Sequence, residues 1–93
     1  MINKKTLYTC IKSGDNIKIN GAVQLDSSNR LIAFSGNFNN LDDTYCGDFV
    51  YTENDEGTIN ISTNNILIEK VTEAIIFLIN VIREIKQELK DLK

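Results

Sequence analysis

The chain has 93 residues, which is the size of one domain with a modest core, so we predict a single domain over residues 1–93. Ten basic residues against thirteen acidic ones give a formal charge of −3. This balance disfavours direct nucleic-acid binding and attachment to an anionic membrane, because both need an excess of positive charge. Histidine, the commonest general base, is absent, and the glycines form no phosphate-binding loop. We therefore expect a protein that is not an enzyme and has no cofactor.

The first ten residues contain lysines but no apolar run, so they do not resemble a secretory signal. This pattern predicts a cytoplasmic location, where thiols stay reduced. Cys10 and Cys46 are then expected to be free thiols that act as small apolar residues. A disulfide between them is the alternative if the chain is exported by another route.

Short runs of alternating apolar and polar residues fill the first two thirds of the chain. Such alternation, interrupted by turn residues, is typical of strands with one buried face. The pattern predicts five strands, at residues 6–12, 16–26, 30–37, 47–53 and 58–62. Residues 39–46 form the longest irregular piece, and residues 54–57, Asn-Asp-Glu-Gly, indicate a hairpin turn. Short turns favour antiparallel neighbours, so the expected topology is a meander.

The strand pattern also predicts which side chains face the core. Gly21 and Gly36 lie within predicted strands and indicate bulges or a close approach of two backbones. The residues expected on the apolar face are Ile17, Ile19, Val23 and Leu25 in the second strand, Ile32, Phe34 and Phe38 in the third, and Phe49 and Tyr51 in the fourth.

Residues 66–93 predict one long helix, which contains neither glycine nor proline. Asn64 or Asn65 is the expected N-terminal cap. With Ile68 at heptad position a, every a and d position is aliphatic, which is typical of a coiled-coil seam. These positions are Ile68, Val71, Ile75, Leu78, Ile82, Ile85, Leu89 and Leu92.

The expected fold is α+β, with an antiparallel sheet of about five short strands (residues 1–62) packed on one long C-terminal helix (residues 63–93). A variant places a sixth strand at residues 66–68.

A 28-residue helix is about 42 Å long, whereas strands of six to eight residues span roughly 20–27 Å. The helix is then longer than the sheet, and its exposed end, which carries Ile85, Leu89 and Leu92, needs a second copy of the chain for cover, in a dimer or higher oligomer. The alternative is a helix that bends and covers only its own sheet. The predicted self-association residues are Val71, Ile75, Leu78, Ile82, Ile85, Leu89 and Leu92.

The stretch between residues 42 and 56 contains six acidic residues and no basic one, and aromatic residues lie in and beside it. Clustered carboxylates next to tyrosines can attract a basic surface of another protein. We therefore predict a non-enzymatic oligomeric protein that binds another macromolecule as an inhibitor, adaptor or regulator. The predicted partner-binding residues are Asp42, Asp43, Tyr45, Asp48, Tyr51 and Glu53.

Two alternatives to this function remain. One is a small-molecule or nucleotide-binding protein with pockets between protomers, where Lys12, Lys18 or Arg30 supply charge. The other is a structural subunit of a larger assembly. Asn39, Asn40, Asp42, Asp43 and Asp48 offer oxygen ligands of the kind that calcium prefers, but their spacing matches no calcium loop, so we predict no metal site.

Overall fold

The computed structural model describes residues 6–91 of the chain, and side chains from residue 8 onward. These residues form five strands and one helix, which confirms the predicted α+β arrangement. The elements are β1 (Thr6–Ser13), β2 (Lys18–Leu25), β3 (Leu31–Asn39), β4 (Tyr45–Glu53), β5 (Ile59–Asn64) and α1 (Ile68–Asp91).

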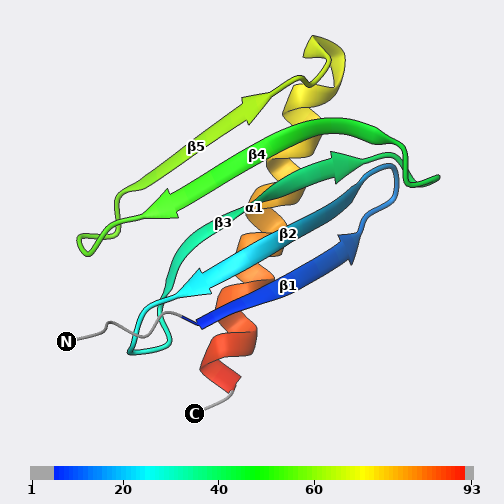
Figure 1. The fold of residues 1–93 in the computed structure, drawn as a ribbon. Coiled ribbons are helices and arrows are strands. Elements are labelled where there is room, and N and C mark those ends of the chain that lie inside the picture. Colours follow the sequence, from blue (N-terminus) through cyan, green and yellow to red (C-terminus); the bar gives the residue numbers. More distant parts are fainter. Residues whose placement is uncertain (1–5, 92–93) are drawn as a thin grey trace.

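The five strands pair in the order β1-β2-β3-β4-β5, and every neighbouring pair is antiparallel, so the predicted meander is confirmed. Figure 1 shows α1 crossing one face of this sheet diagonally, while no helix formed by residues 6–91 lies on the other face. The predicted hairpin at residues 54–57 is also present. Gly57 has a φ of +86° there, and Asn54 accepts hydrogen bonds from the backbone of Glu56 and Thr58.

The core lies between the sheet and α1. The rings of Phe34 and Phe38 pack against Phe49, with centroids 4.9 and 5.1 Å away. From the helix, Leu78 and Ile85 are fully buried against this layer. The strand residues Ile17, Ile19, Val23, Leu25 and Tyr51 are buried as the alternation predicts.

Gly21 and Gly36 face each other across β2 and β3. A Cβ atom at Gly36 would lie 2.2 Å from the carbonyl oxygen of Asn20, and one at Gly21 would meet the Phe34 and Phe49 rings. The predicted close approach of two backbones is therefore confirmed. The missing side chains leave the space that the aromatic rings occupy.

The prediction that Ile32 faces the core is wrong. Leu25 pairs with Leu31 and Gln24 pairs with Ala33, so Ile32 is an extra residue in a β-bulge. The bulge shifts the alternation by one residue, and Leu31 is buried in place of Ile32.

Several predicted boundaries also differ. β3 and β4 extend into the predicted irregular piece and leave only residues 40–44 as a turn. β5 continues to Asn64, and residues 66 and 67 lead into α1, which begins at Ile68, so the predicted sixth strand at residues 66–68 is wrong. Asn65 does not cap the helix. It takes a φ of +60° and turns the chain from β5 towards α1, three residues before the helix begins.

The helix has 24 residues, about 36 Å, and β3 and β4, with nine residues each, are longer than the six to eight residues expected. The expectation that Ile85 lies beyond the sheet is wrong, because Ile85 is 0% exposed within a single chain. Leu89 also packs against the core, and Leu92 lies outside the described residues. The apolar stripe that resembles a coiled-coil seam is therefore covered mainly by the sheet of its own chain.

Candidate functional site

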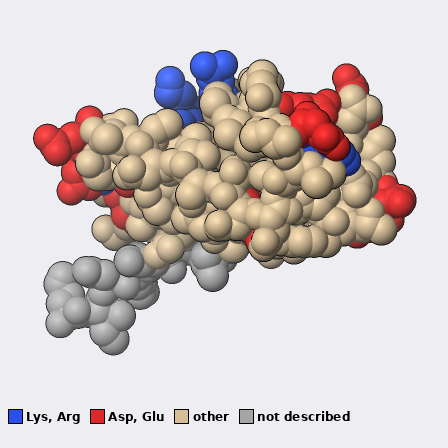
Figure 2. Space-filling view, turned by 90° about the horizontal axis from the view of Figure 1, so that it is seen from above, with Lys and Arg blue, Asp and Glu red and all other residues tan. Residues whose placement is uncertain are grey.

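The acidic stretch between residues 42 and 56 does not form one surface. Asp42, Asp43, Tyr45 and Asp48 lie at the β3–β4 end of the sheet, whereas Asp55 and Glu56 lie in the β4–β5 hairpin at the opposite end. Figure 2 shows acidic side chains at both ends of the molecule, with a largely uncharged region between them. Tyr51 and Glu53 lie on the face of β4 that α1 covers.

The turn at residues 40–44 is held by its own side chains. The Asp42 carboxylate accepts hydrogen bonds from the Thr44 backbone N–H at 3.1 Å and from its hydroxyl at 2.5 Å. These two hydrogen bonds hold the pKa of Asp42 below its ordinary value, and the bond from the Thr44 hydroxyl contributes most. Asp43 takes a φ of +71°, and its carboxylate pairs with the Lys18 ammonium at 2.7 Å. Both carboxylates are thus exposed but ordered.

Tyr45 and Asp48 form a second ordered group at this end. The Tyr45 hydroxyl donates to Asp48 at 2.5 Å, and this hydrogen bond raises the pKa of the phenol. The Asn65 amide donates to both, with distances of 3.3 Å to the Tyr45 oxygen and 3.3 Å to Asp48. Asn65 was predicted as a helix cap, but its structural role is to tie the approach of α1 to β4.

Three further acidic residues join this end from distant parts of the sequence, namely Asp15, Glu69 and Glu73. The Asn16 amide donates to Glu73 at 3.1 Å, and the Lys70 ammonium donates to Asn40 at 2.9 Å. These contacts bring the β1–β2 turn, the β3–β4 turn and the start of α1 together. We call the resulting surface the acidic end: Asp15, Asp42, Asp43, Asp48, Glu69 and Glu73, together with Leu41 and Tyr45.

The charge of the acidic end follows from its composition. Six carboxylates lie near two lysines, Lys18 and Lys70, which leaves a formal charge of −4. Leu41 and Tyr45 are 48% and 51% exposed among these carboxylates. The sequence alone does not predict Asp15, Glu69 and Glu73, because only the folded chain brings their segments together. Leu41 was also not predicted, although it lies next to Asp42 in the sequence.

Tyr51 and Glu53 belong to the structure beneath the helix. The Tyr51 side chain is buried and its hydroxyl donates to Glu53, which also pairs with the Lys86 ammonium at 2.6 Å. Burial and the bond to Glu53 raise the pKa of Tyr51. Burial alone would raise the pKa of Glu53, but the hydrogen bonds from Lys86 and Tyr51 outweigh it, so this pKa lies below its ordinary value. These two predicted site residues therefore contact the protein's own helix.

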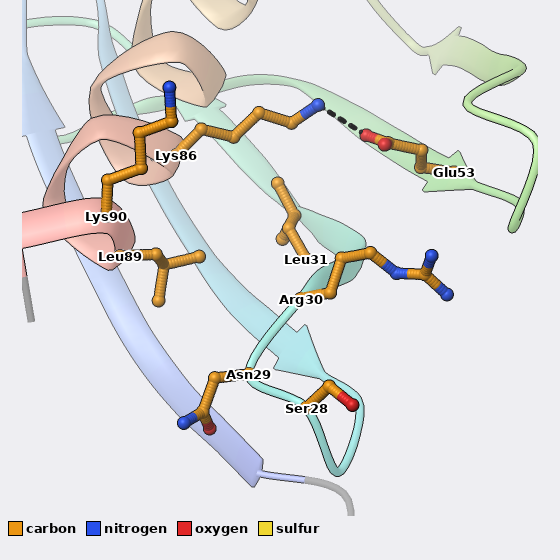
Figure 3. Close-up of a pocket in the computed structure, with 8 residues that line it drawn as sticks. All are labelled: Ser28, Asn29, Arg30, Leu31, Glu53, Lys86, Leu89 and Lys90. Atoms are coloured by element: carbon orange, nitrogen blue, oxygen red, sulfur yellow. Dashed lines mark ion pairs between the residues drawn. The ribbon is translucent and has the colours of Figure 1, made fainter. Parts of the chain in front are cut away.

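A pocket of about 360 Å³ opens beside this ion pair, between the β2–β3 turn and the last turns of α1. Leu31 and Leu89 lie on its two sides, and Arg30, Lys86 and Lys90 lie around it (Figure 3). Arg30 pairs with Asp26 and Asp55, and Lys86 pairs with Glu53. Among the described residues Lys90 has no ion pair, and its ammonium group points away from the two leucines. The pocket thus has apolar walls, and Lys90 lies at its edge with an ammonium group that must turn to reach a bound molecule.

Both cysteines are free thiols, as predicted. Cys10 lies in the core on β1, and Cys46 is half-buried on β4, two strands that do not pair. Burial raises the pKa of each thiol, which lowers the thiolate fraction at neutral pH and makes both poor nucleophiles.

The predicted self-association residues divide into two groups. Leu78, Ile82 and Ile85 are buried against the sheet of their own chain, whereas Val71, Ile75 and Leu89 are half-buried. Leu92 lies outside the described residues. The fully buried group is therefore not available to a second chain.

Within residues 6–91 no three His, Cys, Asp or Glu side chains are grouped so that they can hold a metal ion. In the same part of the chain, no helix is long and apolar enough to span a membrane. Comparison with protein-family models, with curated proteins and with solved structures gives no match for this chain.

Proposed function

We propose that this protein is a small non-enzymatic binding protein that engages a basic surface of another protein through its acidic end. The observation that carries the proposal is the pair of exposed side chains, Leu41 and Tyr45, at the end of the molecule that also carries six carboxylates. Protein interfaces commonly combine an apolar centre that contains an aromatic residue with a charged rim.

The side chains of the acidic end are held in place by hydrogen bonds and an ion pair, which also supports binding. Asp42 is held by Thr44, Asp43 by Lys18, and Asp48 by Tyr45 and Asn65. A surface whose side chains are already fixed loses less conformational entropy when a partner binds. The charge of −4 favours encounter with a basic partner and predicts an association rate that falls as salt is added.

The test compares the two ends of the molecule. The wild-type chain is used to capture proteins from a lysate of the source cells, and each captured protein is titrated against variants. Tyr45→Ala combined with Asp48→Asn is expected to weaken binding by at least about tenfold, because an anchor and a charge are lost together. The control, Asp55→Asn with Glu56→Gln, removes two charges at the opposite end and is expected to change binding by less than about twofold. Equal loss in both variants would contradict the proposal.

The pocket beside Lys90 favours a second candidate, a protein that binds a small acidic molecule. A volume of about 360 Å³ lies within the range of ligand sites, and Leu31, Leu89 and Lys90 offer apolar walls and a cation. A thermal-shift series with carboxylic acids and phosphate esters tests this candidate, because a ligand that binds only the folded chain raises its stability. The expected result is a shift that Lys90→Gln abolishes, whereas no shift at millimolar concentration would contradict it.

A further inference from the structure

The outer edge of β5 has none of the features that usually protect an exposed strand. It is the last strand of the sheet, so no described residue pairs with its outer edge. Its six residues, Ile-Asn-Ile-Ser-Thr-Asn, contain no charge and no proline, and its pairing with β4 is regular. Exposed edges are normally blocked by lysine, proline or a bulge, since an open edge can pair with another strand.

An apolar groove runs between β5 and α1, directly beside this edge. Ile59 and Ile61 from the strand and Ile79 and Ile82 from the helix line it, with Arg83 and Lys86 nearby. Its volume is about 210 Å³. The isoleucines make this groove apolar, and Arg83 and Lys86 place positive charge at its edge.

A pair of exposed apolar side chains follows β5 at its other end. Leu67 is 58% exposed and Ile68 is 85% exposed, and both come within four residues of Asn64. The groove begins at Ile59, at the opposite end of the same strand. One copy of the chain therefore carries a groove at the start of β5 and a projecting apolar pair just beyond its end.

We propose that a second copy of this chain docks on this side of the molecule, with its β5 antiparallel to the first β5 and its Leu67 and Ile68 in the groove at Ile59. In an antiparallel pair the end of each strand lies beside the start of the other. The projecting pair of each copy is thus brought to the groove of its partner, and the two contacts are equivalent by two-fold symmetry. A twofold interface has this self-complementary form.

Charge complementarity supports the same orientation. Glu69 follows Ile68 directly, and Arg83 lies at the groove. When Ile68 enters the groove of the partner, the Glu69 carboxylate of one copy approaches the Arg83 guanidinium of the other. Among the described residues neither Glu69 nor Arg83 has an ion pair within its own chain.

The size of the contact also requires both elements. A stable interface buries more than roughly 1,000 Å² in total, which a six-residue strand edge cannot supply alone. The strand edges give the hydrogen bonds, and the isoleucines of the groove together with Leu67 and Ile68 add the apolar area. This dimer does not depend on the proposed binding role of the acidic end.

The first experiment compares two substitutions of exposed isoleucines by sedimentation velocity. Ile68→Glu removes the apolar side chain that fills the groove and puts a carboxylate among its isoleucines, so it is expected to weaken dimerisation about 100-fold or more. Ile11→Glu is the matched control, because Ile11 is 64% exposed on β1, at the other edge of the sheet. Circular dichroism of both variants is the check that each remains folded. A dimer that survives Ile68→Glu, or that Ile11→Glu disrupts equally, would overturn the proposal.

The second experiment tests the antiparallel orientation by mixing variants. Glu69→Arg alone sets arginine against Arg83, and Arg83→Glu alone sets glutamate against Glu69, so both variants are expected to dimerise at least about tenfold more weakly. An equimolar mixture restores an opposite-charge pair at both symmetric contacts and is expected to recover a dimer that contains one copy of each. A mixture that associates no more strongly than its components would overturn this arrangement.

Discussion

Two neighbouring columns of side chains on α1 have similar composition and opposite surroundings. The sheet-facing stripe, Ala74, Leu78, Val81, Ile82 and Ile85, is buried by the strands of its own chain. The β5 flank, Ile68, Ile75 and Ile79, is half-buried or exposed beside the open edge of the sheet. On this helix, the column in which an apolar residue lies decides whether the sheet of its own chain buries it, and we propose that the open column serves association.

The largest expected effect comes from the stripe. Leu78→Ala leaves a cavity in a fully buried site and is expected to lower the free energy of unfolding by about 2–5 kcal/mol. Urea denaturation at a fixed protein concentration measures the change. A loss below about 1 kcal/mol would mean that the helix does not pack on the sheet as described.

The next largest effect is expected within the sheet, where β2 and β3 approach each other at Gly36. Gly36→Ala places a Cβ atom 2.2 Å from the Asn20 carbonyl oxygen, which forces β2 and β3 apart. We expect a loss of about 1–3 kcal/mol in the free energy of unfolding. The matched control is Ser35→Ala on the exposed face of the same strand, for which denaturation is expected to change by about 0.5 kcal/mol or less. Equal effects of the two substitutions would contradict the glycine contact.

An intermediate effect is expected at the ion pair between Lys86 of α1 and Glu53 of β4. The pKa of Glu53 is lowered from its ordinary value of 4.5, so its ionised form stabilises the folded chain above that pH. This stability is lost as the pH falls from about 4.5 through the lower folded-state pKa. Glu53→Gln is expected to destabilise the chain by about 1–2 kcal/mol at neutral pH and to flatten the acid side of the stability profile. An unchanged profile in thermal melts between pH 3 and pH 7 would argue against this role for Glu53.

The smallest effect on folding is expected on the flank. Ile68→Ala in dilute solution, where the chain is monomeric, is expected to change the free energy of unfolding by about 0.5 kcal/mol or less, because the side chain is mostly exposed. At high protein concentration the same variant is expected to lose stability relative to wild type, since only the wild type gains from dimerisation. Urea denaturation at two concentrations separates these contributions, and a large loss in dilute solution would show that Ile68 belongs to the core.

The sequence was sufficient to predict the sheet because its evidence is local. Alternation in residues 16–26 identified the buried face of β2, and Asn54 to Gly57 identified the hairpin. Local alternation gave the wrong face for Ile32, because one extra residue in a bulge exchanges the buried and exposed positions of the strand, and no residue type identifies the bulge in the sequence. The heptad pattern was misleading for a different reason. A stripe that covers a sheet and a seam that joins two helices have the same spacing, so Ile85 fits both interpretations.

The candidate site was only partly predictable. Asp42, Asp43, Tyr45 and Asp48 are close in sequence and lie together at the acidic end. Tyr51 and Glu53 are equally close in sequence, but an odd separation from Asp48 turns them to the helix-covered face. Asp15, Glu69 and Glu73 join the acidic end through contacts between segments far apart in the chain, which no local pattern reports.

Light scattering of the wild-type chain over a concentration series tests the comparison between stripe and flank most directly. The chain has a mass of 10.5 kDa. Because the stripe is covered by its own sheet and the flank is open beside β5, we expect the average mass to rise with concentration from this value to a plateau at twice this value. A mass that stays at 10.5 kDa at millimolar concentration, or that grows beyond the dimer without a plateau, would contradict it.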